Sequence, residues 1–316
     1  MFNSISVFSG TAHPKFAAGM AKRLGGNLSK ALVTRFSDGE IRVKLLENVR
    51  GKDVFLVQSI SSPVNDSLME LLIMIDALRR ASAKRITAVI PYFAYARQDR
   101  KDQPRVPITA KLVANLLTQA GSDRILTLDL HAGQIQGFFD IPLDHLYAVN
   151  TFVDYFLDKK IGDSLVVVSP DVGGIKMARA YAKRLNAGLA IVDKRRNSPD
   201  STEVVHILGD VSGKSAVLVD DIIATGSSLI QAAKSLKKAG TKKVYAVVTH
   251  GVLSGDVISK LEKSEIEKLF ISDSIPLPKN KKSGKIKVVS VTSLFADAVK
   301  RIHEEKSISI LFDFQS

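Results

Sequence analysis

The chain has 316 residues, of which 45% are hydrophobic and 24% charged, so it is long enough for two globular domains and too apolar to be disordered. It contains no cysteine, no apolar run of about 18 residues and no signal-peptide pattern at its start, so we expect a cytoplasmic protein without disulfides, thiolate metal sites or membrane spans. The net charge of +13 would suit nucleic acid, but the lysines are scattered and no aromatic residues interleave with them. We therefore expect polyanionic small substrates and no nucleic-acid partner, although such substrates account for only part of the charge.

The first elements are a strand at residues 5–8 and a helix at 14–24 that begins with Pro14. Apolar residues on both sides of Asp38-Gly39 then predict a β-hairpin, because Asp-Gly is a preferred hairpin turn. Phe36, Asp38 and Glu40 lie at its tip. They are either a plain turn or an exposed aromatic with two acids that suits a purine ring and its amino group.

A pattern of strand, polar loop, helix and strand occurs twice. The first copy takes residues 54–57, 67–80 and 84–90, and the second takes 216–219, a helix ending at 239, and 242–248. Parallel strands joined by crossover helices explain this spacing, so the fold class is α/β with two similar halves. We expect the first half to span 1–147 and the second 148–300, followed by a tail at 301–316.

A loop rich in cations follows the first copy and contains Arg97, Gln98, Asp99 and Arg100. It is either a solvated basic loop or a mobile segment that binds a triphosphate. The next strand is predicted at residues 125–131. Asp129 and His131, two positions apart, would then point to the same side and could bind a metal or a phosphate.

In the second half, a buried strand at 165–168 leads to Asp171, at the sheet edge where open α/β folds bind ligands. A strand at 190–193 runs into Lys194 and Arg196 beside a loop rich in Pro, Ser and Asp. These cations are either plain surface or a clamp for a transferring phosphoryl group. The last predicted strand takes residues 307–312, where polar and apolar side chains alternate.

The central stretch is 216–228, in which a buried strand ends at Asp220 and Asp221 and a small polar loop opens a helix. The N–H groups and dipole of a helix start favour anions. Carboxylates accept hydrogen bonds from vicinal hydroxyls, so the stretch suits a sugar phosphate. The alternative is a polar strand end followed by a capped helix. The stretch at 216–228 lacks the lysine of a Walker motif and the glycines of a dinucleotide fingerprint.

The segments described above resemble class I ribose-phosphate pyrophosphokinases (PRPP synthetases) over nearly the whole chain. The resemblance rests on Phe-x-Asp-Gly-Glu at 36–40, Tyr-Ala-Arg-Gln-Asp-Arg at 95–100, Asp-Leu-His-Ala at 129–132, Lys-Arg-Arg at 194–196 and the loop at 220–228. The loop alone is shared with phosphoribosyltransferases, which are the alternative. A third alternative is a non-catalytic regulatory subunit of the same family.

The resemblance implies two phosphoribosyltransferase-like domains and transfer of the pyrophosphoryl group of ATP to ribose 5-phosphate. The implied catalytic residues are Lys194 and Arg196. The implied ATP-binding residues are Phe36, Asp38, Glu40, Arg97, Gln98 and Asp99. The ribose 5-phosphate residues would be Asp220, Asp221, Ala224, Thr225, Gly226, Ser227 and Ser228. Mg²⁺ would be held by His131, Asp171 and Asp129, although histidine is an unusual ligand for a hard cation.

The resemblance also implies a homohexamer that is activated by inorganic phosphate and inhibited by ADP at a site between subunits. The matching regulatory residues are Arg50, Gln136, Asp144, Ser307 and Ser309. This chain departs from the family at Ala224, usually an aspartate, and at Ser227-Ser228, which replaces Gly-Thr. Ser228 keeps the hydroxyl, whereas Ala224 lacks a carboxylate. Because the phosphate contacts come from the backbone, we expect these departures to affect ribose 5-phosphate affinity more than activity. Gly133 and His145 also differ from the usual residues and bear on the strength of regulation.

Overall fold

The computed structural model describes residues 5–162, 164–195 and 204–311. The chain forms two compact units, each described by itself. Unit 1 comprises residues 1–147, 274–276 and 291–316, and unit 2 comprises residues 148–273 and 277–290. The first break therefore falls between Tyr147 and Ala148. Among the described residues, no helix is both long and apolar enough to cross a membrane.

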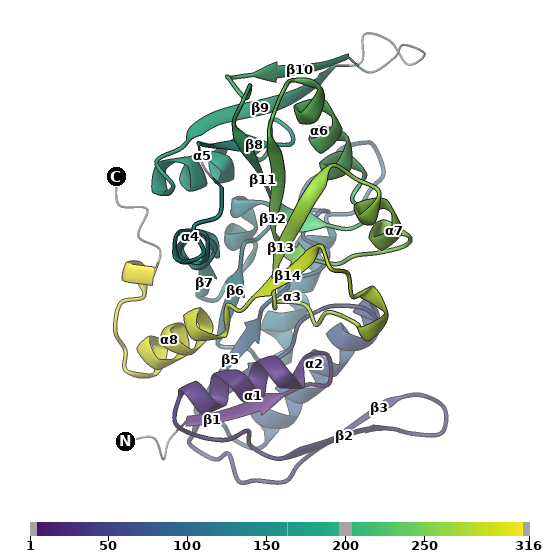
Figure 1. Ribbon diagram of the computed structural model, residues 1–316. Helices are drawn as coiled ribbons and strands as arrows, with labels where there is room; N and C mark the ends of the chain where they lie inside the picture. The colour runs from purple at the N-terminus through teal and green to yellow at the C-terminus, as the bar shows by residue number, and fades with distance from the viewer. Residues whose placement is uncertain (1–4, 163, 196–203, 312–316) are drawn as a thin grey trace. The chain divides into compact units, whose positions relative to one another are not determined.

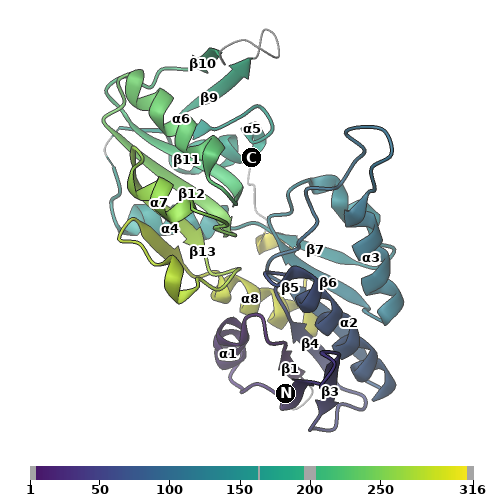
Figure 2. The ribbon, with the colours of Figure 1, turned by 90° about the vertical axis from the view of Figure 1, so that its right-hand side faces the viewer.

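Unit 1 contains a sheet of five parallel strands in the order β1-β4-β5-β6-β7. The strands are β1 (Ile5–Ser9), β4 (Asp53–Val57), β5 (Arg85–Ile90), β6 (Arg124–Leu128) and β7 (Leu143–Leu146). The helices are α1 (Pro14–Arg23), α2 (Val64–Arg80), α3 (Thr109–Ala120) and α8 (Thr292–His303). Figure 2 shows α1 and α8 on one face of this sheet and α2 and α3 on the other. Every residue of β4 is buried, as expected of a strand covered on both faces.

Unit 2 contains a sheet of seven strands in the order β10-β9-β8-β11-β12-β13-β14, in which only β10 is antiparallel to its neighbour. The strands are β8 (Leu165–Ser169), β9 (Gly188–Arg195), β10 (Val204–Leu208), β11 (Ser215–Ile223), β12 (Lys243–Gly251), β13 (Ile266–Ser272) and β14 (Ile286–Val289). The helices are α4 (Val149–Asp158), α5 (Ile175–Arg184), α6 (Ser227–Lys238) and α7 (Val257–Glu262). In Figure 1, α4 and α5 cover one face of this sheet and α6 and α7 cover the other.

The internal repeat is visible in the strand order, because β1-β4-β5-β6-β7 of unit 1 corresponds to β8-β11-β12-β13-β14 of unit 2. The predicted α/β class with two similar halves is therefore confirmed. The units differ in the hairpin that follows the first strand and helix. In unit 1, β2 (Ala31–Arg35) and β3 (Ile41–Leu45) form a separate two-stranded sheet. In unit 2, β9 joins the main sheet beside β8.

The connections in unit 2 create a point where the winding direction reverses. Strand β8 leads through α5 to β9 on one side, whereas β11 leads through α6 to β12 on the other side. Connections that diverge in this way leave a crevice at the carboxyl ends of the two strands, and open α/β sheets bind their ligands there. The sheet of unit 1 has no such reversal between its adjacent strands β1 and β4, because the hairpin stands apart from it.

Helix α6 follows the predicted apolar stripe. Leu229, Ala232, Ala233 and Leu236 are all buried against the sheet. Burial of each leucine contributes about 1.5–3 kcal/mol. Gly240 has a φ of +89° after the last turn, the left-handed conformation that ends a helix and that glycine adopts without strain.

Two features near the end of the chain differ from expectation. Helix α8 was expected in the second half, but it belongs to unit 1, because its buried Phe295 packs edge-on against Phe16 of α1 with ring centroids 5.3 Å apart. The predicted strand at 307–312 is wrong. The described part of this segment instead ends in a short 3-10 helix, η4 (Ser309–Leu311), because alternation over a few exposed residues does not provide a partner strand. Two further 3-10 helices are η2 (Gly133–Phe138) and η3 (Lys279–Lys281).

Candidate active site

The two adjacent carboxylates of unit 2 lie within β11 rather than after it, so the predicted strand end at residue 219 is wrong. The last register pair of β11 with β8 is Leu218 with Val168, whereas pairing with β12 continues through Ile223. The segment that contains Asp220 and Asp221 is therefore still paired with β12 on one side. On its other side, at the reversal point, the pairing with β8 has already ended. Both are partly buried.

Burial and neighbouring negative charge perturb Asp220. Burial raises the pKa of Asp220 to about 8, with further contributions from the charge of Asp221, from a hydrogen bond to it, and from the charge of Asp171. The backbone N–H of Asp221 opposes this shift by donating to Asp220 Oδ1 at 2.9 Å. Three neighbouring carboxylates at the ends of two adjacent strands favour the binding of a proton or a cation.

The loop after β11, in contrast to the carboxylates, favours the binding of an anion. Gly226 has a φ of +73°, and a Cβ at this position would lie 2.8 Å from Val257 Cγ2, so only glycine fits this turn. Helix α6 starts at the next residue, and Thr225 and Ser227 are exposed beside it with their hydroxyl oxygens 3.4 Å apart. The N–H groups of its first turn have no partners within the helix, so they favour an anion.

Ala224 and Ser228 complete the loop. The carbonyl of Ala224 accepts a hydrogen bond from the N–H of Ser254 at 3.0 Å, which fixes the backbone where the family usually carries an aspartate. Ser228 is exposed in the first turn of α6. The seven residues predicted to bind ribose 5-phosphate therefore form one continuous strand end, turn and helix start.

Asp171 is held at the carboxyl end of β8. Its Oδ1 accepts from the N–H of Gly174 at 3.0 Å, and its carbonyl accepts from Ser169 Oγ at 2.6 Å. Gly174 packs so closely that a Cβ would lie 2.7 Å from Ser169 Oγ. The structure thus brings Asp171 close enough to Asp220 for its charge to raise the pKa of Asp220. The sequence alone did not establish that these two residues are neighbours.

Strand β9 is longer than the predicted 190–193 and includes Lys194, which is in register with Val205 of β10. Since β9 runs parallel to β8, the backbone of Lys194 lies toward the same carboxyl edge of the sheet as Asp171. Arg196, the other predicted catalytic residue, lies outside the described residues.

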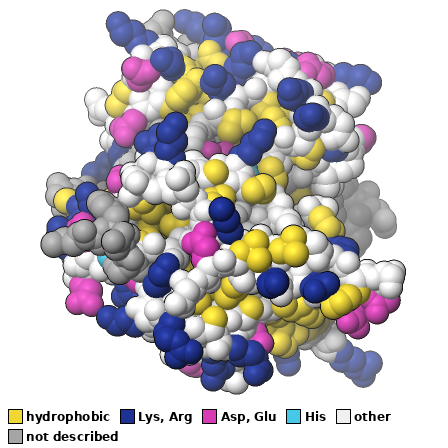
Figure 3. Space-filling view, turned by 90° about the horizontal axis from the view of Figure 1, so that it is seen from below, with side chains coloured by type: hydrophobic (Ala, Val, Ile, Leu, Met, Phe, Trp, Pro, Cys, Tyr) yellow, Lys and Arg dark blue, Asp and Glu magenta, His cyan; other side chains and the backbone are white. Residues whose placement is uncertain are grey.

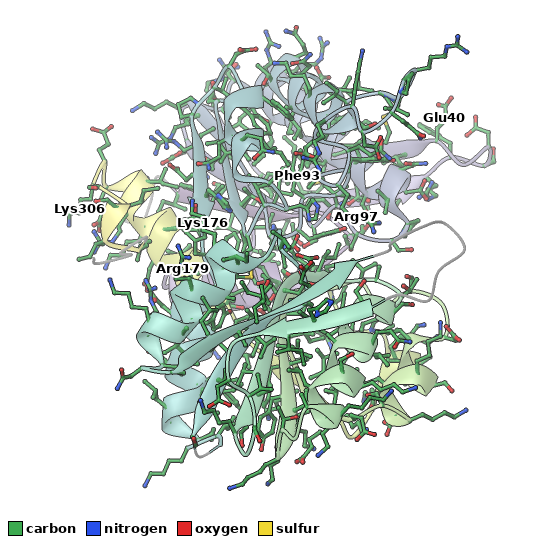
Figure 4. The ribbon with its side chains drawn as sticks, turned by 90° about the horizontal axis from the view of Figure 1, so that it is seen from above. Glu40, Phe93, Arg97, Lys176, Arg179 and Lys306 are labelled. Atoms are coloured by element: carbon green, nitrogen blue, oxygen red, sulfur yellow. The ribbon has the colours of Figure 1, made fainter. Side chains whose placement is uncertain are left out.

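The residues predicted to bind adenine lie at the tip of the β2–β3 hairpin in unit 1. Phe36 is 50% exposed, and the guanidinium carbon of Arg42 lies 5.5 Å from its ring centroid. Asp38 Oδ1 accepts from the N–H of Glu40 at 3.2 Å, which shapes the turn. The hairpin therefore presents an aromatic face and two exposed acids to solvent. In Figure 4, Glu40 lies at the tip, far from Arg97.

The predicted triphosphate loop is anchored at two points. The carbonyl of Gln98 accepts from the N–H of Ala110 at 3.1 Å, and its side chain bonds Thr109, so the loop is tied to the start of α3. Asp99 Oδ2 accepts from Gln134 Nε2 at 2.7 Å, which links this loop to the segment after β6. Arg97, which directly precedes these anchors, is exposed.

The strand argument for Asp129 and His131 is wrong. Strand β6 ends at Leu128, and Asp129 has a φ of +33°, so the two side chains do not share a strand face. Asp129 is buried, and its charge contributes, after burial itself, to a raised pKa of Tyr147. His131 is exposed. Within the described ranges, no group of three or more histidine or acidic residues is spaced to hold a metal ion.

The predicted regulatory residues each have local partners in unit 1. The backbone N–H of Arg50 donates to Asn48 Oδ1 at 3.0 Å, and the residue is exposed. Asp144 pairs with Arg124 at 2.7 Å, and burial raises its pKa while Arg124 opposes that shift. Gln136 Nε2 donates to a backbone carbonyl at 2.9 Å, and the hydroxyl oxygens of Ser307 and Ser309 lie 2.7 Å apart.

Sequence reasoning missed a buried polar network at the carboxyl ends of β1 and β4. Glu70 of α2 is 5% exposed and accepts hydrogen bonds from Thr11 through its N–H and Oγ1, both at 2.6 Å, and from Gln58 at 2.8 Å. A Cβ on Gly10 would lie 2.6 Å from Glu70 Oε1. A carboxylate of the protein thus occupies a backbone donor of the loop after β1, which corresponds to the loop after β8 in unit 2. The available signal was a glutamate within the apolar stripe of α2.

Comparison with known proteins agrees with this architecture. The family model described as the N-terminal domain of ribose phosphate pyrophosphokinase matches residues 5–121, and the model of the phosphoribosyl synthetase-associated domain matches residues 198–313. A protein named ribose-phosphate pyrophosphokinase from Caldanaerobacter subterraneus subsp. tengcongensis is 56% identical over 310 residues, covering 98% of both chains. Another of that name, from Fusobacterium nucleatum, is 52% identical over 99% of both chains.

A solved structure gives the same result. The crystal structure of phosphoribosylpyrophosphate synthetase from Mycobacterium smegmatis is 40% identical and matches with a TM-score of 0.90 over 96% of this chain and 100% of that one. Because these relatives match along nearly their whole lengths, the similarity includes both units, and the chain belongs to the ribose-phosphate pyrophosphokinase family.

Proposed function

We propose that the protein transfers the pyrophosphoryl group of ATP to the anomeric hydroxyl of ribose 5-phosphate, giving PRPP and AMP as an activated ribose for nucleotide biosynthesis. The observation that supports this most is the pairing of Asp220 and Asp221 with the start of α6 at the reversal point of unit 2. Hydroxyl acceptors and an anion site lie within one short loop, as a sugar phosphate requires. The relatives named ribose-phosphate pyrophosphokinase match both units, which favours this activity over phosphoribosyl transfer.

In the proposed reaction, the anomeric oxygen attacks the β-phosphorus of ATP, the bond to the α-phosphate oxygen breaks, and AMP leaves. The attacking hydroxyl releases its proton to solvent as the new bond to the β-phosphorus forms. The backbone N–H groups of residues 225–228 hold the 5-phosphate, and Asp220 and Asp221 accept from the ribose hydroxyls. Lys194 and Arg196 stabilise charge on the transferring group. Such catalysis consists mainly of positioning and charge neutralisation.

We propose Mg²⁺ as the cofactor. The donor set of unit 2 fits it, because Asp171 and Asp221 lie close enough to Asp220 for their charges to raise its pKa in addition to the effect of burial. Magnesium commonly uses one or two carboxylates together with substrate phosphates. Asp171 would hold the ion in unit 2, and the family resemblance also implies His131 and Asp129 as ligands. The ion would neutralise charge on the polyphosphate.

ATP would bind through the hairpin residues Phe36, Asp38 and Glu40 and the loop residues Arg97, Gln98 and Asp99. An exposed aromatic at a hairpin tip suits stacking on adenine. We propose that the active form is a homo-oligomer, a hexamer by family resemblance, in the cytoplasm. Light scattering that found a fully active monomer would contradict the assembly.

We propose that inorganic phosphate activates the enzyme and that ADP inhibits it through Arg50, Gln136, Asp144, Ser307 and Ser309. A single exposed arginine suits a phosphate. In rate measurements against ATP at several ADP levels, the wild type should show inhibition that is not purely competitive, and Arg50→Ala should lose phosphate activation. Full activity without phosphate, with purely competitive ADP inhibition, would remove the regulatory site and leave the catalytic assignment intact.

The test of the activity is AMP formation that depends on ribose 5-phosphate. The double variant Asp220→Asn/Asp221→Asn should bind ribose 5-phosphate much more weakly and ATP nearly as before. Asp210→Asn, an exposed acid of the same unit, serves as the control. Equal losses for both substrates would argue against this division, and AMP formation independent of ribose 5-phosphate would reject the activity.

A further inference from the structure

Unit 2 has a pocket of about 790 Å³ at the sheet edge opposite to the candidate active site. Ser215, Lys243 and Ile286, the first residues of β11, β12 and β14, line it together with the turn after α4. Asp220 lies five residues further along β11, about 17 Å away at about 3.3 Å per residue. The pocket is therefore separate from the sugar-phosphate loop.

Six lysines line this pocket. They are Lys159, Lys160, Lys242, Lys243, Lys268 and Lys287. All six are exposed, and no carboxylate lines the pocket in the described part of the chain, which omits Asp163. Lys159 Nζ pairs with Asp158 at 2.7 Å, outside the lining, and Lys268 Nζ donates to the carbonyl of Gly284 at 2.7 Å. A concave surface with this much charge of one sign attracts a polyanion.

The lysines of this pocket converge from several segments of unit 2. On the face shown in Figure 3, the lysines and arginines are dispersed among acidic, apolar and neutral side chains. Dispersed cations contribute to the net charge of +13 without forming a site. The pocket lysines come from the turn after α4, the starts of β12 and β14, and β13, so segments distant in sequence bring them together.

The floor of the pocket is aromatic. Phe270 is 4% exposed, with ring centroids 5.8 Å from Tyr155 and 6.4 Å from Tyr245. Gly162 forms part of the wall with a φ of +79°, and a Cβ there would lie 2.6 Å from Leu165 Cδ2, so this turn requires glycine. A volume between about 300 and 1,000 Å³ with an apolar floor and a few polar groups is typical of small-molecule sites.

We propose that this pocket is a second ligand site that binds a nucleoside polyphosphate, with the phosphates on the lysines and the base against the aromatic floor. Lysine ammonium groups bind phosphates as point charges. A single pocket of this volume suits one nucleotide, whereas single-stranded nucleic acid requires a groove that follows several residues of backbone. The site goes beyond the proposed catalytic function and does not depend on it.

The first experiment counts ATP sites on the full chain by equilibrium dialysis with EDTA and without ribose 5-phosphate. Wild type should bind more than one ATP per chain. Lys243→Ala/Lys287→Ala should weaken the additional site by about 10-fold per lysine, since a hydrogen bond to a charged group contributes about 1.5–3 kcal/mol. Asp220→Asn/Asp221→Asn should leave it unchanged. A single ATP per chain in the wild type would overturn the proposal.

The matched control is Lys234→Ala/Lys238→Ala, which removes two exposed lysines of α6 that do not line the pocket. Retained ATP binding in this control supports a specific site. An equal loss of ATP affinity in both double variants would show that general charge attraction explains the binding, and it would overturn the proposal. Since the replaced lysines are exposed, the variants should unfold at the wild-type midpoint. If Lys243→Ala/Lys287→Ala fails to fold, Lys160→Ala/Lys268→Ala replaces it in the same assay.

A second experiment identifies the ligand class. Tyr155→Ala should weaken ATP but not inorganic tripolyphosphate, because only ATP has a base to contact the half-buried ring. Equal affinity of wild type for both ligands, with no effect of Tyr155→Ala, would overturn the nucleotide assignment. Tighter binding of a single-stranded oligonucleotide to the same lysines, or a change of oligomeric state in the lysine variant by light scattering, would also overturn it.

Discussion

Replacing Asp220 by asparagine should change how the stability of the ligand-free protein depends on pH. The pKa of Asp220 is about 8 in the folded protein, compared with 3.8 for the ordinary side chain. A carboxyl group with a raised folded-state pKa contributes stability that is fully present below the unfolded pKa and is lost as the pH rises through the folded pKa. One pKa unit corresponds to about 1.4 kcal/mol, so this group should reduce the free energy of unfolding by about 2 kcal/mol between pH 6 and pH 8.

The assay is urea unfolding of wild type and Asp220→Asn at pH 6, 7 and 8 without divalent cations. Asparagine does not titrate, so the variant should gain about 2 kcal/mol relative to wild type across this range. Asp210→Asn is the control, because Lys214 lowers the pKa of the exposed Asp210 and both states are ionised throughout. Parallel pH profiles for wild type and Asp220→Asn would refute the claim that burial and neighbouring charge raise the pKa of Asp220.

Three further predictions address other residues. Lys194→Ala should lower turnover by about 10²–10³-fold with an unchanged unfolding midpoint, since one charge-stabilising group typically contributes that much, and near-native turnover would reject its assignment. Phe36→Ala should raise the KM for ATP with little loss of stability, because the ring is half exposed; an unchanged ATP dependence in initial-rate assays would count against the hairpin. Phe295→Ala should lower the free energy of unfolding by about 3–5 kcal/mol, because this buried ring packs on Phe16. If urea titration gave a decrease below about 1 kcal/mol in the free energy of unfolding, the contact between α1 and α8 would not be what stabilises α8 on unit 1.

The elements that the sequence predicted well are those with local signals. The stripe of α6, the Asp-Gly hairpin and the loop at 224–228 depend on spacing and turn chemistry within a few residues, and the structure has each of them. The proximity of Asp171 to Asp220 was predictable only in outline. Both lie at strand ends, but it is the order of strands in the sheet that places β8 beside β11.

The predictions that failed needed non-local information. Asp129 was placed on a strand face by alternation, but its backbone turns into the left-handed region as β6 ends, and the N–H of Asp129 bonds the carbonyl of Leu146 at 3.0 Å. The return of α8 to unit 1 depends on Phe295 meeting a ring 279 positions earlier in the chain, Phe16. Alternation and helical periodicity contain no information on such distant contacts.

The return of α8 has a consequence for how the protein is made. Asp53, at the start of β4, accepts hydrogen bonds from Arg85 Nε at 2.8 Å and contacts His303 Nδ1 at 2.7 Å, while Arg85 also donates to the carbonyl of Ile302 at 3.1 Å. These contacts, with Phe295, join the last helix to the first unit. During synthesis from the amino terminus, the residues of unit 2 up to 290 are therefore translated before α8. The apolar surface of α1 therefore stays uncovered until nearly the whole chain has been synthesised. Unit 2 can finish folding first, although synthesis of unit 1 begins first.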